Sequence, residues 1–261
     1  MIRAVVAGAA GRMGSTILAA LQKEKDFTIA GAFERPGSEH VGRDASGVPI
    51  SAGIEPALAK GADVVVDFTA PAASVQHAAV CSDRGIALVI GTTGFTEEQK
   101  SALRAASRRI PLLLAPNMSA GVNVLFRLVA DAARALGSSY DVEVLEMHHR
   151  MKRDAPSGTA LRLAEVAADA LGLHAKDPFV VQRQGETDAR KAGTIGIQAL
   201  RGGDVVGDHT VHFLADGERL ELTHRATSRD NFARGAVRAA RWLAGKKPGF
   251  YDMQDVLGLR T

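Results

Sequence analysis

The sequence predicts an α/β fold with two domains, in which a parallel sheet flanked by helices is followed by an α+β domain with a mostly antiparallel sheet. Three observations support this. Apolar, strand-like runs alternate with helical patterns over the first part of the chain. Between 194 and 225 the polar and apolar residues alternate with a period of two instead. The stretch 232–244 then returns to helical spacing.

The first strand, 2–7, leads into the glycine-rich run Gly8-Ala9-Ala10-Gly11-Arg12-Met13-Gly14 and then a helix. This arrangement is typical of a Rossmann-like domain, where glycines let the backbone approach a pyrophosphate at the helix N-terminus. The second strand ends at Glu34, about 20 residues after Gly14, where an acid usually binds the adenosine ribose. Arg35 could instead hold a 2′-phosphate. We therefore expect NADH, NADPH or both as the cofactor.

Three further strands, 63–68, 86–90 and 110–114, follow the same alternation with helices. Parallel sheets bind ligands outside the carboxyl ends of their strands. The loops after the second and third of these strands are therefore expected to contact the nicotinamide half of the cofactor. These loops are Gly91-Thr92-Thr93 and Ala115-Pro116-Asn117-Met118.

The most unusual stretch lies between the strand that begins at 141 and the helix 158–171. Two imidazoles and three cations occur within six residues, in the run His148-His149-Arg150-Met151-Lys152-Arg153. Ser157 is expected to cap the helix, with Gly158 and Thr159 in its first turn, and such a terminus binds anions. The combination predicts a small, multiply anionic ligand and proton transfer beside it. The alternative is a solvated basic loop before an ordinary capped helix.

The second domain contains three strand-like runs, 194–200, 205–214 and 219–225, separated by the turn signals Gly202-Gly203-Asp204 and Asp216-Gly217. They predict an antiparallel meander. Few helices are available to cover this sheet, so one face is expected to form a subunit interface. His209 and His212, three residues apart, would point to opposite faces, which favours surface or interface histidines over a metal site.

The C-terminal segment is expected to rejoin the first domain. The predicted boundaries are 1–119 together with 229–261 for the dinucleotide-binding domain, and 120–228 for the substrate-binding and oligomerisation domain.

Composition excludes several classes of protein. The formal charge is only +3, and the aromatic residues, 5% of the chain, are not interleaved with basic ones, so nucleic acid is not an expected partner. No apolar run reaches the roughly 18 residues that span a membrane. The single cysteine, Cys81, rules out an intramolecular disulfide and a cysteine-based metal cluster, and its apolar surroundings predict a buried, inert thiol. A cytoplasmic location fits these features.

With these motifs the chain resembles the 4-hydroxy-tetrahydrodipicolinate (dihydrodipicolinate) reductase family over essentially its whole length. The central signature is the run Glu146 to Leu161, and the supporting motifs are Gly8–Gly14, Glu34-Arg35, Gly91–Phe95, Ala115–Ser119, Arg201–Asp204, His224–Ala226 and Tyr251–Met253. Two positions depart from the common pattern, Met151 and Arg153, and both could alter local pKa values.

The resemblance implies a function and a site. NADH or NADPH would deliver hydride to a small cyclic dicarboxylate with loss of water, giving tetrahydrodipicolinate in the diaminopimelate route to lysine. His148 would donate or accept a proton, Lys152 would donate one, and His149, Gly158 and Thr159 would hold the substrate carboxylates. No metal is implied, and the inserted domain, 120–228, would assemble a homotetramer.

Two other functions compete with this one. A semialdehyde dehydrogenase needs a nucleophilic cysteine in its catalytic domain, whereas Cys81 lies in the first domain; an amino-acid dehydrogenase is a related possibility. A nucleotide-sensing regulator would bind nicotinamide cofactor without turnover, and it would leave the loop of imidazoles and cations unexplained.

Overall fold

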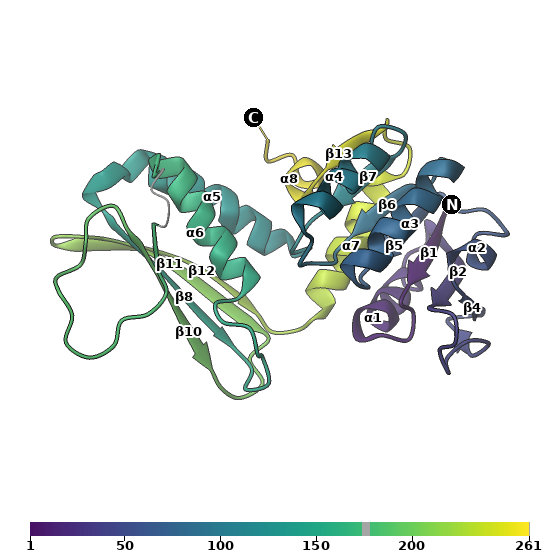
Figure 1. Cartoon of the computed structure of the whole chain (residues 1–261), viewed down its shortest axis with the longest axis horizontal. Helices are drawn as coiled ribbons and strands as arrows, with labels where there is room; N and C mark the ends of the chain where they lie inside the picture. The colour runs from purple at the N-terminus through teal and green to yellow at the C-terminus, as the bar shows by residue number, and fades with distance from the viewer. Residues whose placement is uncertain (174–177, 261) are drawn as a thin grey trace. The chain divides into compact units, whose positions relative to one another are not determined.

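The computed structural model describes residues 1–173 and 178–260 (Figure 1). It forms two compact units. One consists of residues 1–120 together with the segment that begins at Asp230, and the other is Gly121–Arg229.

The first unit is built on an eight-stranded sheet with the order β13-β7-β6-β5-β1-β2-β4-β3. All neighbouring pairs are parallel except β3 with β4. The strands are β1 (Ile2–Ala7), β2 (Phe27–Glu34), β3 (Asp44–Ala45), β4 (Val48–Ala52), β5 (Val64–Asp67), β6 (Ala87–Ile90), β7 (Pro111–Leu114) and β13 (Gly249–Tyr251). The chain order reverses between β1 and β5, and this is where ligands bind in such sheets.

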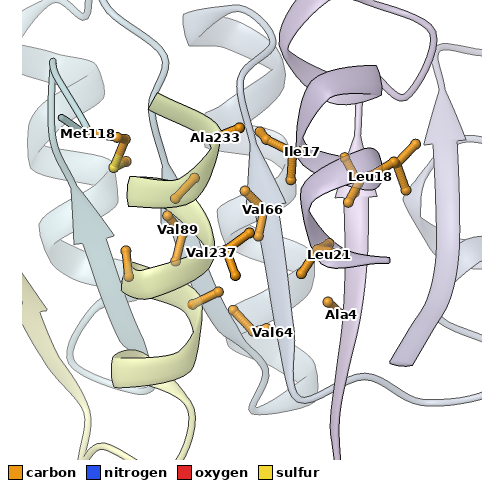
Figure 2. Packing of buried hydrophobic residues seen from close by; sticks show 14 of the residues in the cluster. Ala4, Ile17, Leu18, Leu21, Val64, Val66, Val89, Met118, Ala233 and Val237 are labelled. Atoms are coloured by element: carbon orange, nitrogen blue, oxygen red, sulfur yellow. The ribbon is translucent and has the colours of Figure 1, made fainter. Parts of the chain in front are cut away.

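Helices cover both faces of this sheet. They are α1 (Arg12–Leu21), α2 (Ile54–Ala57), α3 (Pro71–Arg84), α4 (Glu97–Ala106), α7 (Asp230–Leu243) and α8 (Met253–Leu257). Successive residues of a strand point to opposite faces. Ala4 and Val6 therefore pack with α1 and α7, whereas Val5 and Ala7 pack with α3 and α4. Figure 2 shows the first of these cores, with Ile17 of α1 and Val237 of α7 beside the strands.

Cys81 confirms the expectation of an inert thiol. It lies on α3 and is fully buried, and burial raises the pKa of the thiol to about 12. A thiol that is hard to ionise in this way cannot act as a nucleophile near neutral pH.

The second unit has a five-stranded sheet with the order β12-β11-β8-β10-β9. Its elements are α5 (Ala120–Leu136), the 3-10 turn η1 (Gly137–Ser139), β8 (Asp141–His148), α6 (Gly158–Leu171), β9 (Phe179–Val180), β10 (Ile195–Arg201), β11 (Gly207–Ala215) and β12 (Glu218–Ala226). Helices α5 and α6 form an apolar core with one face of the sheet, to which Val142 and Val144 of β8 contribute. Leu145 and Met147 alternate with these residues and therefore point to the opposite face.

The predicted meander is only partly right. β11 and β12 form the expected hairpin around Asp216-Gly217. β10 and β11 do not pair, because β8 lies between them, antiparallel to β11 and parallel to β10. The Gly202-Gly203-Asp204 turn is therefore a crossover and not a hairpin.

Candidate active site

The candidate site in the second unit begins at the end of β8. Glu146 and His148 are two residues apart on this strand, so their side chains point to the same face, and both are buried. Nδ1 of His148 donates to Oε2 of Glu146 at 2.6 Å. The strand thus places the His148 ring in a hydrogen bond with the Glu146 carboxylate.

The Glu146 carboxylate has four hydrogen-bond donors. Besides His148, Nη1 and Nη2 of Arg201 donate to Oε2 and Oε1 at 2.8 and 2.9 Å, and the backbone N–H of Ser157 donates to Oε1 at 3.0 Å. Burial acts to raise the pKa of Glu146, but the hydrogen bonds from His148 and Arg201 outweigh it and lower the value to about 2. Glu146 is therefore an ionised carboxylate inside the protein.

The loop after β8 carries the other charged residues of the motif. Nζ of Lys152 donates to both oxygens of Asp154, at 2.7 and 2.9 Å, and these bonds hold the pKa of Asp154 below its usual value. Nη2 of Arg229 lies 3.4 Å from Nε2 of His149. The start of the loop is also bonded to the turn after β10, where the N–H of Gly202 donates to the carbonyl of His148 at 2.9 Å.

Helix α6 begins where the sequence predicts. Ser157 is its N-cap, and its Oγ accepts from the N–H of Ala160 at 3.2 Å. Gly158 and Thr159 occupy the first turn, so the positive end of the helix dipole lies next to the loop. The structure thus brings His148, Lys152 and the start of α6 into one region of a single unit.

His209 corrects the prediction of a surface or interface histidine. It is only 3% exposed, and its Nε2 lies 3.2 Å from Oγ of Ser157. Its ring meets that of His148 edge to face, with the centroids 5.1 Å apart. Burial, and then the charge of His148, lower the pKa of His209 to about 3. His209 is therefore a neutral packing partner of His148.

Sequence reasoning missed Glu146, Arg201 and His209 as parts of the site. The spacing of Glu146 and His148 was a usable signal, because residues i and i+2 of a strand share a face. Arg201 belongs to a supporting motif of the family resemblance, but its spacing does not link it to Glu146, and His209 had no signal at all. Both residues reach the site because β10 and β11 flank β8.

In the first unit, the loops predicted to hold a cofactor lie together at the carboxyl edge of the sheet. The N–H of Ala9 donates to the carbonyl of Phe33 at 3.2 Å, and the N–H of Gly91 to that of Asp67 at 2.8 Å. The side chains of Ala115 and Met118 are buried in the apolar core, where Figure 2 shows Met118. Only the backbone of these two residues can face a ligand. Of the remaining loop residues, Thr93 and Pro116 are exposed, Asn117 is half-buried, and Thr92 is buried with its Oγ1 accepting from Ser74 at 3.0 Å.

The glycine loop fits a dinucleotide. Gly8 has a φ of +63°, which favours glycine. A Cβ at Gly14 would collide with the backbone of Gly8 and Ala9, so the helix approaches the loop as closely as the fingerprint requires. Oε1 of Glu34 accepts from the N–H of Ala10 at 3.0 Å, which places the predicted ribose-binding acid beside the loop. Arg12 and Arg35 are exposed, and Gly11 begins α1 as its N-cap.

Two family models together span almost the whole chain. The model of the N-terminal part of dihydrodipicolinate reductase matches residues 2–118, and the model of its C-terminal part matches 121–257. The chain belongs to the dihydrodipicolinate reductase family. Full-length relatives agree with this assignment: the 4-hydroxy-tetrahydrodipicolinate reductases of Anaeromyxobacter dehalogenans and Myxococcus xanthus are 56% and 55% identical, and each match covers 100% of this chain and 99% of the relative.

Solved structures show the same fold. A dipicolinate-bound dihydrodipicolinate reductase from Paenisporosarcina sp. TG-14 has a TM-score of 0.79 at 23% identity and covers 98% of both chains. GenD2 from gentamicin A biosynthesis, in complex with NAD, has a TM-score of 0.61 at 15% identity, covering 99% of this chain and 90% of its own. The family and its Rossmann-like domain indicate a nicotinamide nucleotide cofactor.

The two residues expected to depart from the family pattern lie on the outside of the loop. Met151 is 77% exposed, and Arg153 is also exposed. Within 1–173 and 178–260, no group of three or more metal-ligating side chains is placed to hold a metal ion. Over the same residues, no helix is both long and apolar enough to cross a membrane.

Proposed function

We propose that the protein reduces 4-hydroxy-tetrahydrodipicolinate to tetrahydrodipicolinate with NADH or NADPH, releasing water, in the diaminopimelate route to lysine. The observation that supports this most strongly is the loop after β8, where a carboxylate-held imidazole and an ammonium flank a capped helix N-terminus. Such a site suits a ring with two carboxylates that must receive a proton.

Substrate binding falls to three residues at this end of the second unit. His149, Gly158 and Thr159 would hold the two carboxylates. Gly158 and Thr159 lie in the first turn of α6, where backbone N–H groups and the helix dipole favour negative charge. His149 lies beside Arg229, so positive charge is also available on the loop side.

Proton transfer is the task of His148 and Lys152. A bound nicotinamide cofactor would supply the hydride, and the chain itself must supply a proton to the neighbouring ring atom and help water to leave. Nε2 of His148 is available for this exchange because Nδ1 is engaged by Glu146. Lys152 carries a mobile proton on an ammonium held at the loop by Asp154. Either group can act as the acid.

The cofactor would bind at the carboxyl edge of the first sheet. Its proposed contacts are Gly8, Ala9, Ala10, Gly11, Arg12, Met13, Glu34, Arg35, Gly91, Thr92, Thr93, Ala115, Pro116, Asn117 and Met118. Glu34 suits the ribose hydroxyls of NADH, and Arg35 suits the 2′-phosphate of NADPH, so use of both cofactors is proposed. Removing Arg35 should raise the KM for NADPH more than that for NADH, and removing Glu34 should do the reverse.

A homotetramer formed through the sheet of the second unit, and a cytoplasmic location, complete the proposal. The resemblance to the family suggests the tetramer. The sheet face that carries Leu145 and Met147, opposite the α5–α6 core, offers a surface for it. The single buried cysteine is in keeping with a reducing compartment.

A direct assay tests the reaction. Protein is mixed with NADPH and freshly generated dihydrodipicolinate, and absorbance of the reduced nicotinamide is followed. Loss of absorbance that depends on both components supports the proposal. Tight NADPH binding without turnover would favour a nucleotide-sensing regulator instead.

A further inference from the structure

We propose that Glu146 is a positioning residue that fixes the ring of His148 with its proton on Nδ1, and that Arg201 holds the Glu146 carboxylate in the orientation this requires. The inference rests on the proposed function, since it concerns the same site. It adds two residues to which no role in the reaction has been given.

The direction of one hydrogen bond fixes the tautomer of His148. An ionised carboxylate can only accept hydrogen bonds. Because Oε2 of Glu146 lies 2.6 Å from Nδ1 of His148, that nitrogen must carry a proton. In the neutral ring Nε2 is then the bare nitrogen, and in the charged ring it is the acidic one. Glu146 thus selects which atom exchanges a proton with the substrate.

The carboxylate of Glu146 cannot turn. Arg201 binds both of its oxygens, and Nη2 of Arg201 also donates to the carbonyl of Asp154 at 2.7 Å. The N–H of Ser157 donates to the same Oε1. One carboxylate therefore fixes the proton-transferring ring and the start of α6 relative to each other, which are the two parts of the site that must meet one substrate.

The space around Nε2 of His148 is restricted on the side of β11. A Cβ at Gly207 of β11 would lie 3.0 Å from Nε2 of His148, so any larger residue would crowd that atom. Glu146 on β8 and His209 on β11 contact the imidazole itself. The other ionisable groups of the surrounding elements are Arg201 on β10, which binds Glu146, and Lys152 and Asp154 in the loop, which bind each other. Of these, Glu146 is the carboxylate in direct contact with the ring.

A purely structural role is the competing explanation, because a buried ion pair between Glu146 and Arg201 also ties β8 to β10 and to the loop. The two explanations differ in what they predict for His148. A structural tie affects folding alone, whereas a positioning residue changes the tautomer of His148 and the pH profile of turnover.

The first experiment needs no variant of Glu146. Long-range proton–nitrogen NMR spectra of the wild-type protein at neutral pH report which ring nitrogen of each histidine is protonated, and the His148→Gln variant assigns the His148 signals by their loss. We expect a proton on Nδ1 of His148. A neutral ring with its proton on Nε2 would overturn the proposal, whether or not the protein turns over dihydrodipicolinate.

The second experiment compares Glu146→Gln with Glu143→Gln. Glu143 is a matched control, since it lies on the same strand and is bound by Arg183 and Arg190 but has no contact with His148. In Glu146→Gln, Arg201 and Ser157 donate to the amide oxygen, so the NH₂ group faces Nδ1 of His148. This arrangement favours the tautomer that carries its proton on Nε2. We expect kcat to fall by at least about 10²-fold, the lower end of what a positioned acid contributes. The alkaline limb of the kcat–pH profile should move to lower pH, and the cofactor KM should be unchanged.

The outcomes distinguish a failure of the positioning role from a failure of the proposed reaction. Wild-type kcat and pH profile in Glu146→Gln would overturn the positioning role, and so would an equal loss in Glu143→Gln. If Glu146→Gln fails to fold, as judged by near-UV circular dichroism, the wild-type tautomer decides alone. A wild-type protein without turnover would instead refute the proposed reaction, while the NMR result on His148 would still stand.

Discussion

In the proposed reaction His148 and Lys152 are two candidate acids for one substrate, and single substitutions test the contribution of each. We expect His148→Gln and Lys152→Ala each to lower kcat by about 10²–10⁴-fold, because each removes one positioned proton donor. Cofactor affinity should hardly change, since the proposed cofactor contacts lie in the other unit. Steady-state kinetics with NADPH and dihydrodipicolinate measure both quantities. Wild-type turnover by either variant would remove that residue from the mechanism.

His209 should make stability depend on pH. Burial lowers the pKa of His209 from its ordinary value of 6.5 to about 3 in the folded protein. Between these two values the unfolded chain binds a proton on this ring and the folded protein does not. Stability from the neutral ring is complete above pH 6.5 and is lost as the pH falls towards 3. The loss should reach roughly 3–5 kcal/mol at the acid end.

Urea unfolding at pH 7, 5 and 4 tests this. The difference in unfolding free energy between wild type and His209→Gln should shrink as the pH falls, because the glutamine of the variant does not titrate and only the wild-type protein loses stability at this position. His212→Gln on the same strand is the control, since His212 is more exposed and lies near Glu221. A wild-type curve that stays parallel to His209→Gln would contradict the prediction.

At this scale the sequence was informative about residue types but not about neighbours. The crowding of imidazoles and cations without an acid between them predicted an anion site with proton transfer, and the resemblance to the family implied the roles of His148 and Lys152. The sequence predicted the wrong environment for His209. Strand alternation separates His209 from His212 but does not say which face of the sheet is covered by a helix. The pair Glu146–Arg201 depends on β8 and β10 being neighbours, which only the fold reveals.

At the scale of single elements, the cap of α6 should affect ligand binding as well as stability. Ser157→Ala removes the acceptor for the N–H of Ala160 and the contact with His209, so we expect a loss of about 1 kcal/mol in unfolding free energy. The start of the helix would also loosen where Gly158 and Thr159 present their N–H groups. Calorimetric titration with pyridine-2,6-dicarboxylate should show a higher Kd.

Thr96→Ala is the matched control for this substitution. Thr96 caps α4 in the first unit and forms a capping box with Gln99, so its removal should cost a similar free energy. It should leave the Kd for pyridine-2,6-dicarboxylate unchanged. Equal effects of the two variants on that Kd would mean that the cap of α6 matters only for stability.

The connection between β10 and β11 shows where element-scale prediction failed. Period-two alternation locates a strand, and glycines locate a turn, but neither indicates which strands pair. In the structure the turn serves the loop of the site: Gly202 donates to the carbonyl of His148, and the carbonyl of Gly203 accepts from Arg150 at 3.2 Å. The glycines that looked like a hairpin signal therefore help to hold the loop of the candidate site.

At the scale of the whole molecule, the parallel sheet is completed by residues far apart in the sequence. β13 pairs with β7, so the last strand added to the sheet follows the entire second unit in the chain. Alternation of strands and helices made β1, β2, β5, β6 and β7 of this sheet predictable. The short β3 and β4 were not predicted, since runs of two and five residues are too short to give a clear periodic signal.

The proposed tetramer makes a prediction about the sheet of the second unit. Leu200 of β10 pairs in register with Met147 of β8, so both point away from the α5–α6 core, and Leu200 is 45% exposed in the single chain. An apolar side chain on an uncovered sheet face is a reasonable contact between copies. Leu200→Glu should therefore lower the molar mass measured by light scattering from that of four chains to that of one or two.

A second exposed apolar residue supplies the comparison. Val41, in the first unit, is 37% exposed, and Val41→Glu introduces the same charge without touching this face. It should keep the wild-type mass. If the wild-type protein is itself a single chain in solution, or if Leu200→Glu retains four chains, this face is not the interface. The glutamate of Val41→Glu should be tolerated because water reaches it. The glutamate of Leu200→Glu would be an unpaired carboxylate buried between subunits, which is strongly unfavourable.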